Sequence, residues 1–131
     1  MEQIVLDTNI FLRYILRDVE NQYLISKNFF TKAKSKSIHL IIPQIVIFEI
    51  VFNLDKYYGF EKSKIVKVVK DLLLTSALDV QDNDIFNVAV DIYENNSIDF
   101  VDSFIIAKAQ ISNAKIFSFD KDFDKLTKTK T

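Results

Sequence analysis

The sequence has no cysteine and only one glycine, one proline and one histidine in 131 residues. Without cysteine, the chain has no disulfides, thiol nucleophiles or thiolate metal sites. A single histidine excludes the common zinc-enzyme ligand sets, and a single glycine excludes a glycine-rich phosphate loop. Any metal must therefore be held mainly by oxygen, which favours Mg²⁺ or Mn²⁺.

Long hydrophobic runs are also missing. The longest apolar stretch, residues 40–52, is interrupted by polar residues, and a transmembrane helix needs about 20 apolar residues. The first residues carry no basic leader, so we expect no signal peptide, no membrane association and a cytoplasmic protein.

Charge of one sign does not dominate, since the net charge is −1. This value does not indicate the basic face of a typical nucleic-acid binder. If four acids were gathered in one metal site, however, the rest of the chain would carry +3. Overall charge therefore does not exclude a nuclease.

The hydrophobic pattern predicts short strands at residues 4–7, 39–42, 77–80 and 115–119. Helical patterns follow Asp7 and cover about residues 21–36, 43–58, 61–75, 83–96 and 99–112. This alternation predicts an α/β sandwich whose mainly parallel central sheet is flanked by helices, in a single domain of residues 1–131. Sites in such sheets lie at the carboxyl ends of strands.

Two acids follow predicted strands, Asp7 after the first and Asp120 after the last. Asp7 fits equally well as a helix N-cap, and Asn9 as either a turn residue or a group that orients a carboxylate. For Asp122 and Asp124 we favour a solvated turn.

Three further acids lie in predicted helices. Glu49 interrupts an apolar run, where a buried carboxylate is costly unless paired or metal-bound. Alternatively, the helix turns a solvent face made by Ile45, Glu49, Asn53 and Lys56. Asp99 and Asp102 share the first turn of a helix; we expect Asp99 to cap it and Asp102 to point at the sheet edge.

The ordered segments VLDTNIFLRYIL, the Glu49 helix, DFVDSFIIAKAQ and IFSFDKDFDKL resemble the PIN-domain family, particularly its VapC-type toxins. The resemblance covers nearly the whole chain and implies a PIN-like three-layer sandwich. It matches Asp7, Glu49, Asp102 and Asp120 to the family's acidic metal site and Asn9 to its common polar neighbour. Ser118 stands where the family more often has threonine.

The resemblance implies a divalent-metal-dependent endoribonuclease using Mg²⁺ or Mn²⁺. It also implies that the protein is the toxin of a type II toxin–antitoxin pair, with a cognate antitoxin as partner. We expect a homodimer, because the helices around Gly59 are more hydrophobic than so small a chain needs. Arg13 and Arg17, one helical turn apart, are read either as contacts for RNA phosphates or an antitoxin carboxylate, or as a solvated helix face.

Two alternatives stay open: a catalytically weak PIN-fold module that binds RNA or protein, and a nuclease outside any toxin–antitoxin system that processes RNA or is directed at DNA. A phosphatase of the haloacid-dehalogenase type is disfavoured, because Asn9 stands where that fold needs an aspartate. His39 is expected to be a polar strand residue.

Overall fold

The computed structural model describes residues 1–121 and 123. Strands β1 (Glu2–Val5), β2 (Ile38–Ile42) and β3 (Leu78–Val80) form a parallel sheet in the order β1-β2-β3. β2 is central, and its Leu40 and Ile42 are fully buried, as expected for a strand covered on both faces. The predicted α/β architecture with a parallel sheet is confirmed.

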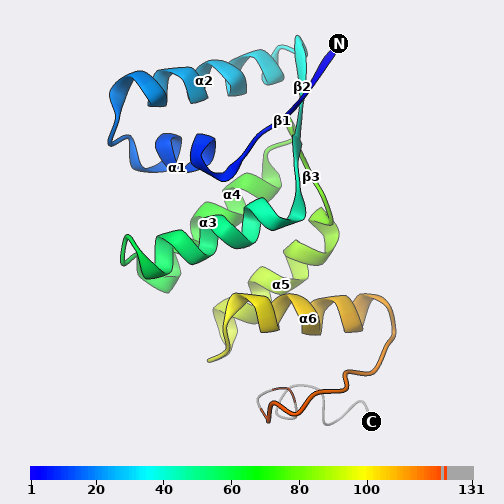
Figure 1. Cartoon of the computed structure of the whole chain (residues 1–131). Helices are drawn as coiled ribbons and strands as arrows, with labels where there is room; N and C mark the ends of the chain where they lie inside the picture. Colours follow the sequence, from blue (N-terminus) through cyan, green and yellow to red (C-terminus); the bar gives the residue numbers. More distant parts are fainter. Residues whose placement is uncertain (122, 124–131) are drawn as a thin grey trace.

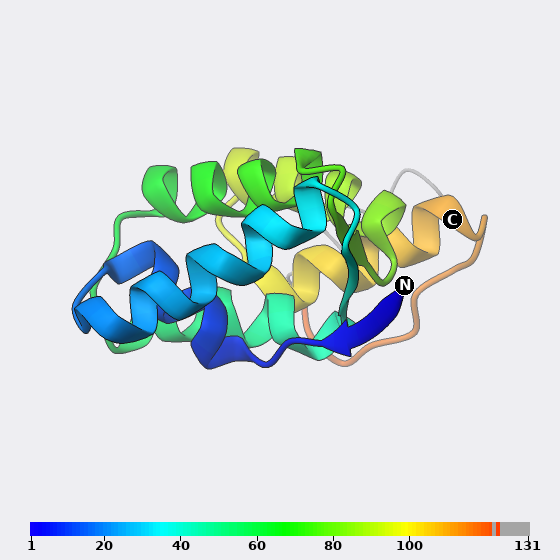
Figure 2. The same ribbon diagram turned by 90° about the horizontal axis from the view of Figure 1, so that it is seen from above.

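Pairs of helices connect the strands (Figure 1). α1 (Thr8–Leu16) and α2 (Glu20–Lys34) join β1 to β2, and α3 (Gln44–Lys56) and α4 (Lys62–Leu74) join β2 to β3. α5 (Asn83–Asn95) and α6 (Phe100–Ile111) follow β3. Seen from above, α4 lies on one side of the molecule and α1 and α3 on the other (Figure 2). No helix in the described residues is long and apolar enough to cross a membrane.

The scarce turn residues are used where the backbone requires them. Pro43 precedes the first residue of α3 in an extended conformation, which suits a residue without a backbone donor. Gly59 adopts a φ of 62° just after α3, in the left-handed region that glycine tolerates best. Arg17 ends α1 with a φ of 47°, so a non-glycine residue makes the turn into α2.

The hydrophobic core consists of two clusters of buried side chains. A large cluster joins the strands to residues of all six helices, and a smaller one joins α5 to α6 through Ile85, Ala89 and Ala107. Phe104 packs against both clusters, and its ring lies 5.0 Å from that of Phe48, which packs on the large cluster. α6 therefore packs mainly on α5 and only slightly on α3.

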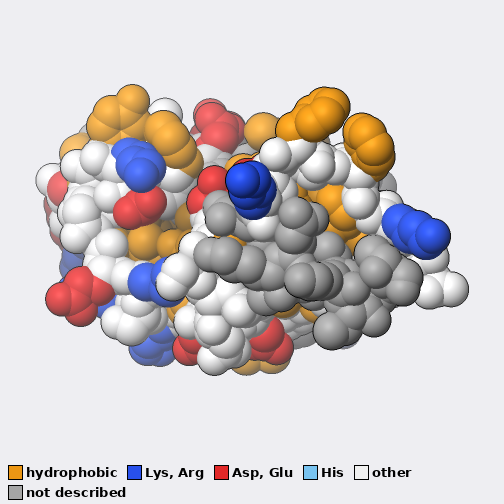
Figure 3. Space-filling view, turned by 90° about the horizontal axis from the view of Figure 1, so that it is seen from below, with side chains coloured by type: hydrophobic (Ala, Val, Ile, Leu, Met, Phe, Trp, Pro, Cys, Tyr) orange, Lys and Arg blue, Asp and Glu red, His pale blue; other side chains and the backbone are white. Residues whose placement is uncertain are grey.

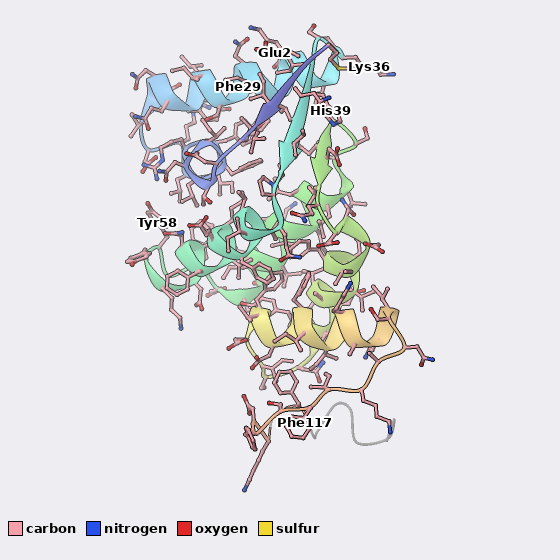
Figure 4. The ribbon with its side chains drawn as sticks, turned by 45° about the vertical axis from the view of Figure 1, so that its right-hand side comes forward. Glu2, Phe29, Lys36, His39, Tyr58 and Phe117 are labelled. Carbon is pink, nitrogen blue, oxygen red and sulfur yellow. The ribbon has the colours of Figure 1, made fainter. Side chains whose placement is uncertain are left out.

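The strand predicted at residues 115–119 is wrong. No strand is assigned there, and the side chains of Phe117 and Phe119 are 92% and 95% exposed. The segment lies beyond α6, away from the sheet, as the labelled Phe117 shows (Figures 1 and 4). The local pattern favours an extended chain, but a strand also needs a neighbour, and the α5–α6 pair leads the chain away from β1.

Within the described residues, β1 is consequently an edge strand. Hydrophobic side chains remain exposed on the face seen from below (Figure 3). Asp120 does not follow a strand and does not share the edge of the sheet where Asp7 lies.

Candidate functional site

The carboxyl ends of the three strands collect polar residues. β1 leads through buried Leu6 to Asp7, β2 leads through Pro43 to Gln44, and β3 leads through Gln81 to Asp82. The Gln44 backbone N–H donates to Gln81 Oε1 at 2.9 Å, and the Gln44 side-chain amide donates to Asp82 Oδ2. This edge is where parallel sheets commonly place their sites.

Asp7 is the N-cap of α1. Its Oδ1 accepts a hydrogen bond from the Ile10 backbone N–H at 3.4 Å, a long and therefore weak contact. The side chain is also exposed. The capping interpretation is confirmed, but so loose a cap leaves the carboxylate accessible for another role.

Glu49 reaches the same place from α3. The Thr8 hydroxyl donates to Glu49 Oε1 at 2.9 Å, which ties this carboxylate to the residue that follows Asp7. Glu49, Ile45 and Lys56 are exposed and Asn53 is half-buried, so the solvent-face interpretation of this helix is confirmed for three of its four residues. The sequence interpretation missed Thr8, although its place between Asp7 and Asn9 was the available signal.

Asp99 and Asp102 lie together at the start of α6. Asp99 Oδ1 accepts from the Asp102 backbone N–H at 2.8 Å, which confirms Asp99 as the N-cap. Ser103, fully buried behind them, donates to the Asp99 carbonyl at 2.8 Å. Asp102 is half-buried on the first turn, on a helix that packs mainly against α5 rather than at the end of β1.

Asp120 and Ser118 lie in the segment beyond α6. The Asp120 backbone N–H donates to the Ser118 hydroxyl at 2.9 Å, so this hydroxyl shapes the local turn. Both residues are exposed. Asp122 and Asp124 lie outside the described residues.

The structure thus brings Glu49 to the strand end that carries Asp7 but does not assemble all four acids. Within residues 1–121 and 123, no three His, Cys, Asp or Glu side chains are placed to hold a metal ion together. Mg²⁺ is nevertheless often bound by one or two carboxylates, with waters and substrate phosphates as the other ligands. The Asp7 and Glu49 oxygens have the right donor chemistry for such a site.

Arg13 of α1 and Arg17, the residue that caps its end, are both engaged by local partners. Arg13 forms an ion pair with Asp18 at 3.1 Å and donates to the Tyr58 hydroxyl at 3.1 Å. Arg17 binds Glu20 at 2.9 Å, and this hydrogen bond holds the pKa of the Glu20 carboxyl below its usual value. Neither arginine presents an uncompensated charge to an incoming phosphate.

His39 lies at the opposite end of the strands from Asp7 (Figure 4). Its Nε2 is 2.8 Å from Asp79 Oδ2 on the neighbouring strand. It is a polar strand residue, as expected, and is remote from the carboxyl edge.

A cavity of about 400 Å³ adjoins Asp7 between α1 and α2. It is lined by Asp7, Asn9, Ile10, Arg13, Gln22, Ile25 and Ser26. Asn9 is exposed on the first turn of α1, where its amide shares this cavity with the Asp7 carboxylate.

Comparison with known proteins agrees with this architecture. Residues 4–129 match the model of the PIN domain. The chain is 28% identical over 123 residues to a VapC ribonuclease of Aquifex aeolicus (strain VF5), covering 93% of this chain and 90% of that protein. No solved structure matches the chain. On the strength of the match over nearly its whole length, the chain belongs to the PIN domain family.

Proposed function

We propose that this PIN-domain protein is a divalent-metal-dependent endoribonuclease that hydrolyses RNA phosphodiester bonds. The observation that carries the proposal is the 2.9 Å hydrogen bond from Thr8 to Glu49, which holds this carboxylate beside the residue that follows Asp7. The similarity to a protein named VapC ribonuclease, which covers 93% of this chain, supports RNA as the substrate.

The catalytic and metal-binding residues in this proposal are Asp7, Glu49, Asp102 and Asp120. Support for Asp7 and Glu49 comes from the hydrogen bond between Thr8, the neighbour of Asp7, and Glu49, whereas Asp102 and Asp120 enter through the family resemblance. A bound Mg²⁺ or Mn²⁺ supplies positive charge at the scissile phosphate and lowers the pKa of water.

The chain itself supplies the arrangement of charge. Asp7 and Glu49 present exposed anionic oxygens on two different helical connections. Thr8 restrains the Glu49 carboxylate through one oxygen and leaves the other for a ligand. The exposed Asn9 amide is able to orient a water or a neighbouring carboxylate.

The deciding experiment compares cleavage of a mixed RNA pool by the wild type and by Asp7→Asn, with Mg²⁺, with Mn²⁺ and with a chelator. We expect cleavage by the wild type with metal, and almost none with chelator or by the variant. Cleavage that persists in chelator, or full activity of Asp7→Asn, contradicts the carboxylate–metal mechanism.

We further propose that the protein is the toxin of a type II toxin–antitoxin pair. The support is the name of the Aquifex aeolicus relative. The proposal includes a cognate antitoxin, a homodimer and a cytoplasmic location. A small neighbouring reading frame whose product relieves growth arrest on co-expression supports it, and growth that is unaffected by expression of the active protein contradicts it.

A second candidate is a catalytically weak module that binds RNA or protein. It is favoured by one observation, the lack of a three-acid metal site in the described part of the chain. Heat denaturation with increasing Mg²⁺ or Mn²⁺ separates the two, since a ligand that binds only the folded state raises the melting temperature.

A further inference from the structure

Two of the residues that line the cavity beside Asp7 carry a buried polar atom without a hydrogen-bond partner. Across the described residues, the buried side-chain atoms without a hydrogen-bond partner are Arg13 Nε and Ser26 Oγ. Both residues line this cavity. Buried polar groups are almost always paired, since leaving one unpaired costs stability. Two such groups at one cavity therefore point to a ligand.

The other lining residues define the kind of ligand. Ile10 and Ile25 supply apolar walls, and the exposed Asn9 and Gln22 supply amides that both donate and accept. The volume of about 400 Å³ lies within the range of small-molecule sites. Flat polar rings such as nucleobases need apolar faces together with hydrogen bonds at their edges.

The charges argue against a phosphate in this cavity. Its one cationic residue, Arg13, is already paired with Asp18 at 3.1 Å, and Asp7 adds a negative charge. An anion would meet repulsion without a free cation to offset it. An uncharged group that donates and accepts hydrogen bonds is not repelled by Asp7 and needs no free cation.

We propose that this cavity binds one unpaired nucleobase of the RNA strand and thereby selects where the strand is cut. The inference rests on the proposed ribonuclease function, which places the scissile phosphate at Asp7, next to the cavity. Gln22 and Asn9 contact the edge of the base, and Ser26 contributes its hydroxyl. Gln22 is exposed and lies one turn before Ser26 on α2, and the proposal requires its side chain to move so that the base reaches the buried Ser26 hydroxyl.

Binding is measured without metal, so that cleavage does not interfere. The probes are labelled single-stranded RNAs that are identical except for one central base, together with a version that lacks that base. We expect the wild type to prefer one base on the order of tenfold over the others, and to bind the abasic RNA at least as weakly as the least favoured base. Gln22→Leu and Ser26→Ala should reduce this preference to about twofold.

The matched control is Asn21→Leu, an exposed change on the same helix that does not line the cavity, and it should keep the wild-type preference. Ser26→Ala should not lower the melting temperature, because the hydroxyl that it removes has no partner in the fold. A lower melting temperature would assign this hydroxyl to folding and remove it from the proposal.

Equal binding of all probes, the absence of RNA binding, or an equal weakening of every probe in the Gln22 and Ser26 variants overturns the inference. Failure of the ribonuclease proposal looks different, since base-selective binding would then persist in a protein that does not cut RNA. If both hold, mapped cut sites should lose their preference at one nucleotide position in Ser26→Ala.

Discussion

Asp7 caps α1 and is proposed to bind a metal ion, and a pair of substitutions distinguishes these two roles. As the N-cap of α1 it needs only an oxygen that accepts from the Ile10 N–H, which asparagine provides as well as aspartate. As a ligand of a cation it needs a negative charge, which asparagine lacks. Asp7→Asn therefore removes the charge and keeps the cap, whereas Asp7→Ala removes both.

The expected magnitudes follow from the structure. Loss of an N-cap costs about 0.5–2 kcal/mol, and the long, exposed 3.4 Å contact places Asp7 near the lower end. For a chain of 131 residues, a loss of about 0.5–1 kcal/mol lowers the melting temperature by roughly 2–4 °C. Asp7→Ala should show this decrease, and Asp7→Asn should stay within about 0.5 kcal/mol of the wild type.

The loss of RNA cleavage in the two variants should not follow their loss of stability. Altering a residue that only supports a metal ligand typically costs 10–100-fold, so loss of a ligand itself should cost at least about 100-fold. Both variants should fall by this amount when cleavage of one defined RNA is measured well below the melting temperature. An Asp7→Asn enzyme that keeps more than about a tenth of wild-type activity, while Asp7→Ala loses both activity and stability, would leave Asp7 as a cap alone.

Three further predictions concern the other acids and assembly. Glu49→Gln should abolish cleavage, as Asp7→Asn should. Thr8→Val should reduce cleavage less, because the Glu49 carboxylate remains and only its 2.9 Å hydrogen bond to Thr8 is lost. Equal losses in the Glu49 and Thr8 variants would make Thr8 more than a positioning residue. In the same RNA assay, Asp102→Asn and Asp120→Asn should be nearly inactive, and the nearby Asp122→Asn and Asp124→Asn should be mild; a mild Asp120→Asn would remove that residue from the site. Sedimentation at micromolar concentration should show a dimer, and a monomer there would contradict the proposed assembly.

Features that depend on short stretches of sequence were predictable. The buried strands near residues 40 and 78 follow from short apolar runs, which suit strands covered on both faces. Asp99 caps α6 because its side chain needs only the N–H of a residue three positions later. Such interactions depend only on neighbouring residues, so the sequence predicted both the start of the helix and its cap.

Features that depend on distant parts of the chain were not predictable in the same way. Thr8 and Glu49 are 41 positions apart, and no local pattern shows that a hydroxyl on α1 meets a carboxylate on α3. The prediction of a strand at residues 115–119 was wrong for a related reason. Its apolar pattern favours extension, but a strand forms only where the fold provides a paired edge, and the α5–α6 packing directs the chain elsewhere.

The position of β1 at the edge of the sheet bears directly on what the site is able to bind. Within the described residues β1 pairs only with β2, and Val5 at its end is 64% exposed. A strand on its outer side would enclose Asp7, whereas an edge position leaves the carboxylate open to a polymer too large to enter a closed cavity. α1 and α3, which contact each other, hold the two acids from successive connections. Next to Asp7, the Thr8 hydroxyl binds Glu49, and Asp7 itself lines the cavity between α1 and α2, so an RNA strand is able to lie across the edge with one base inserted beside the proposed cleavage site.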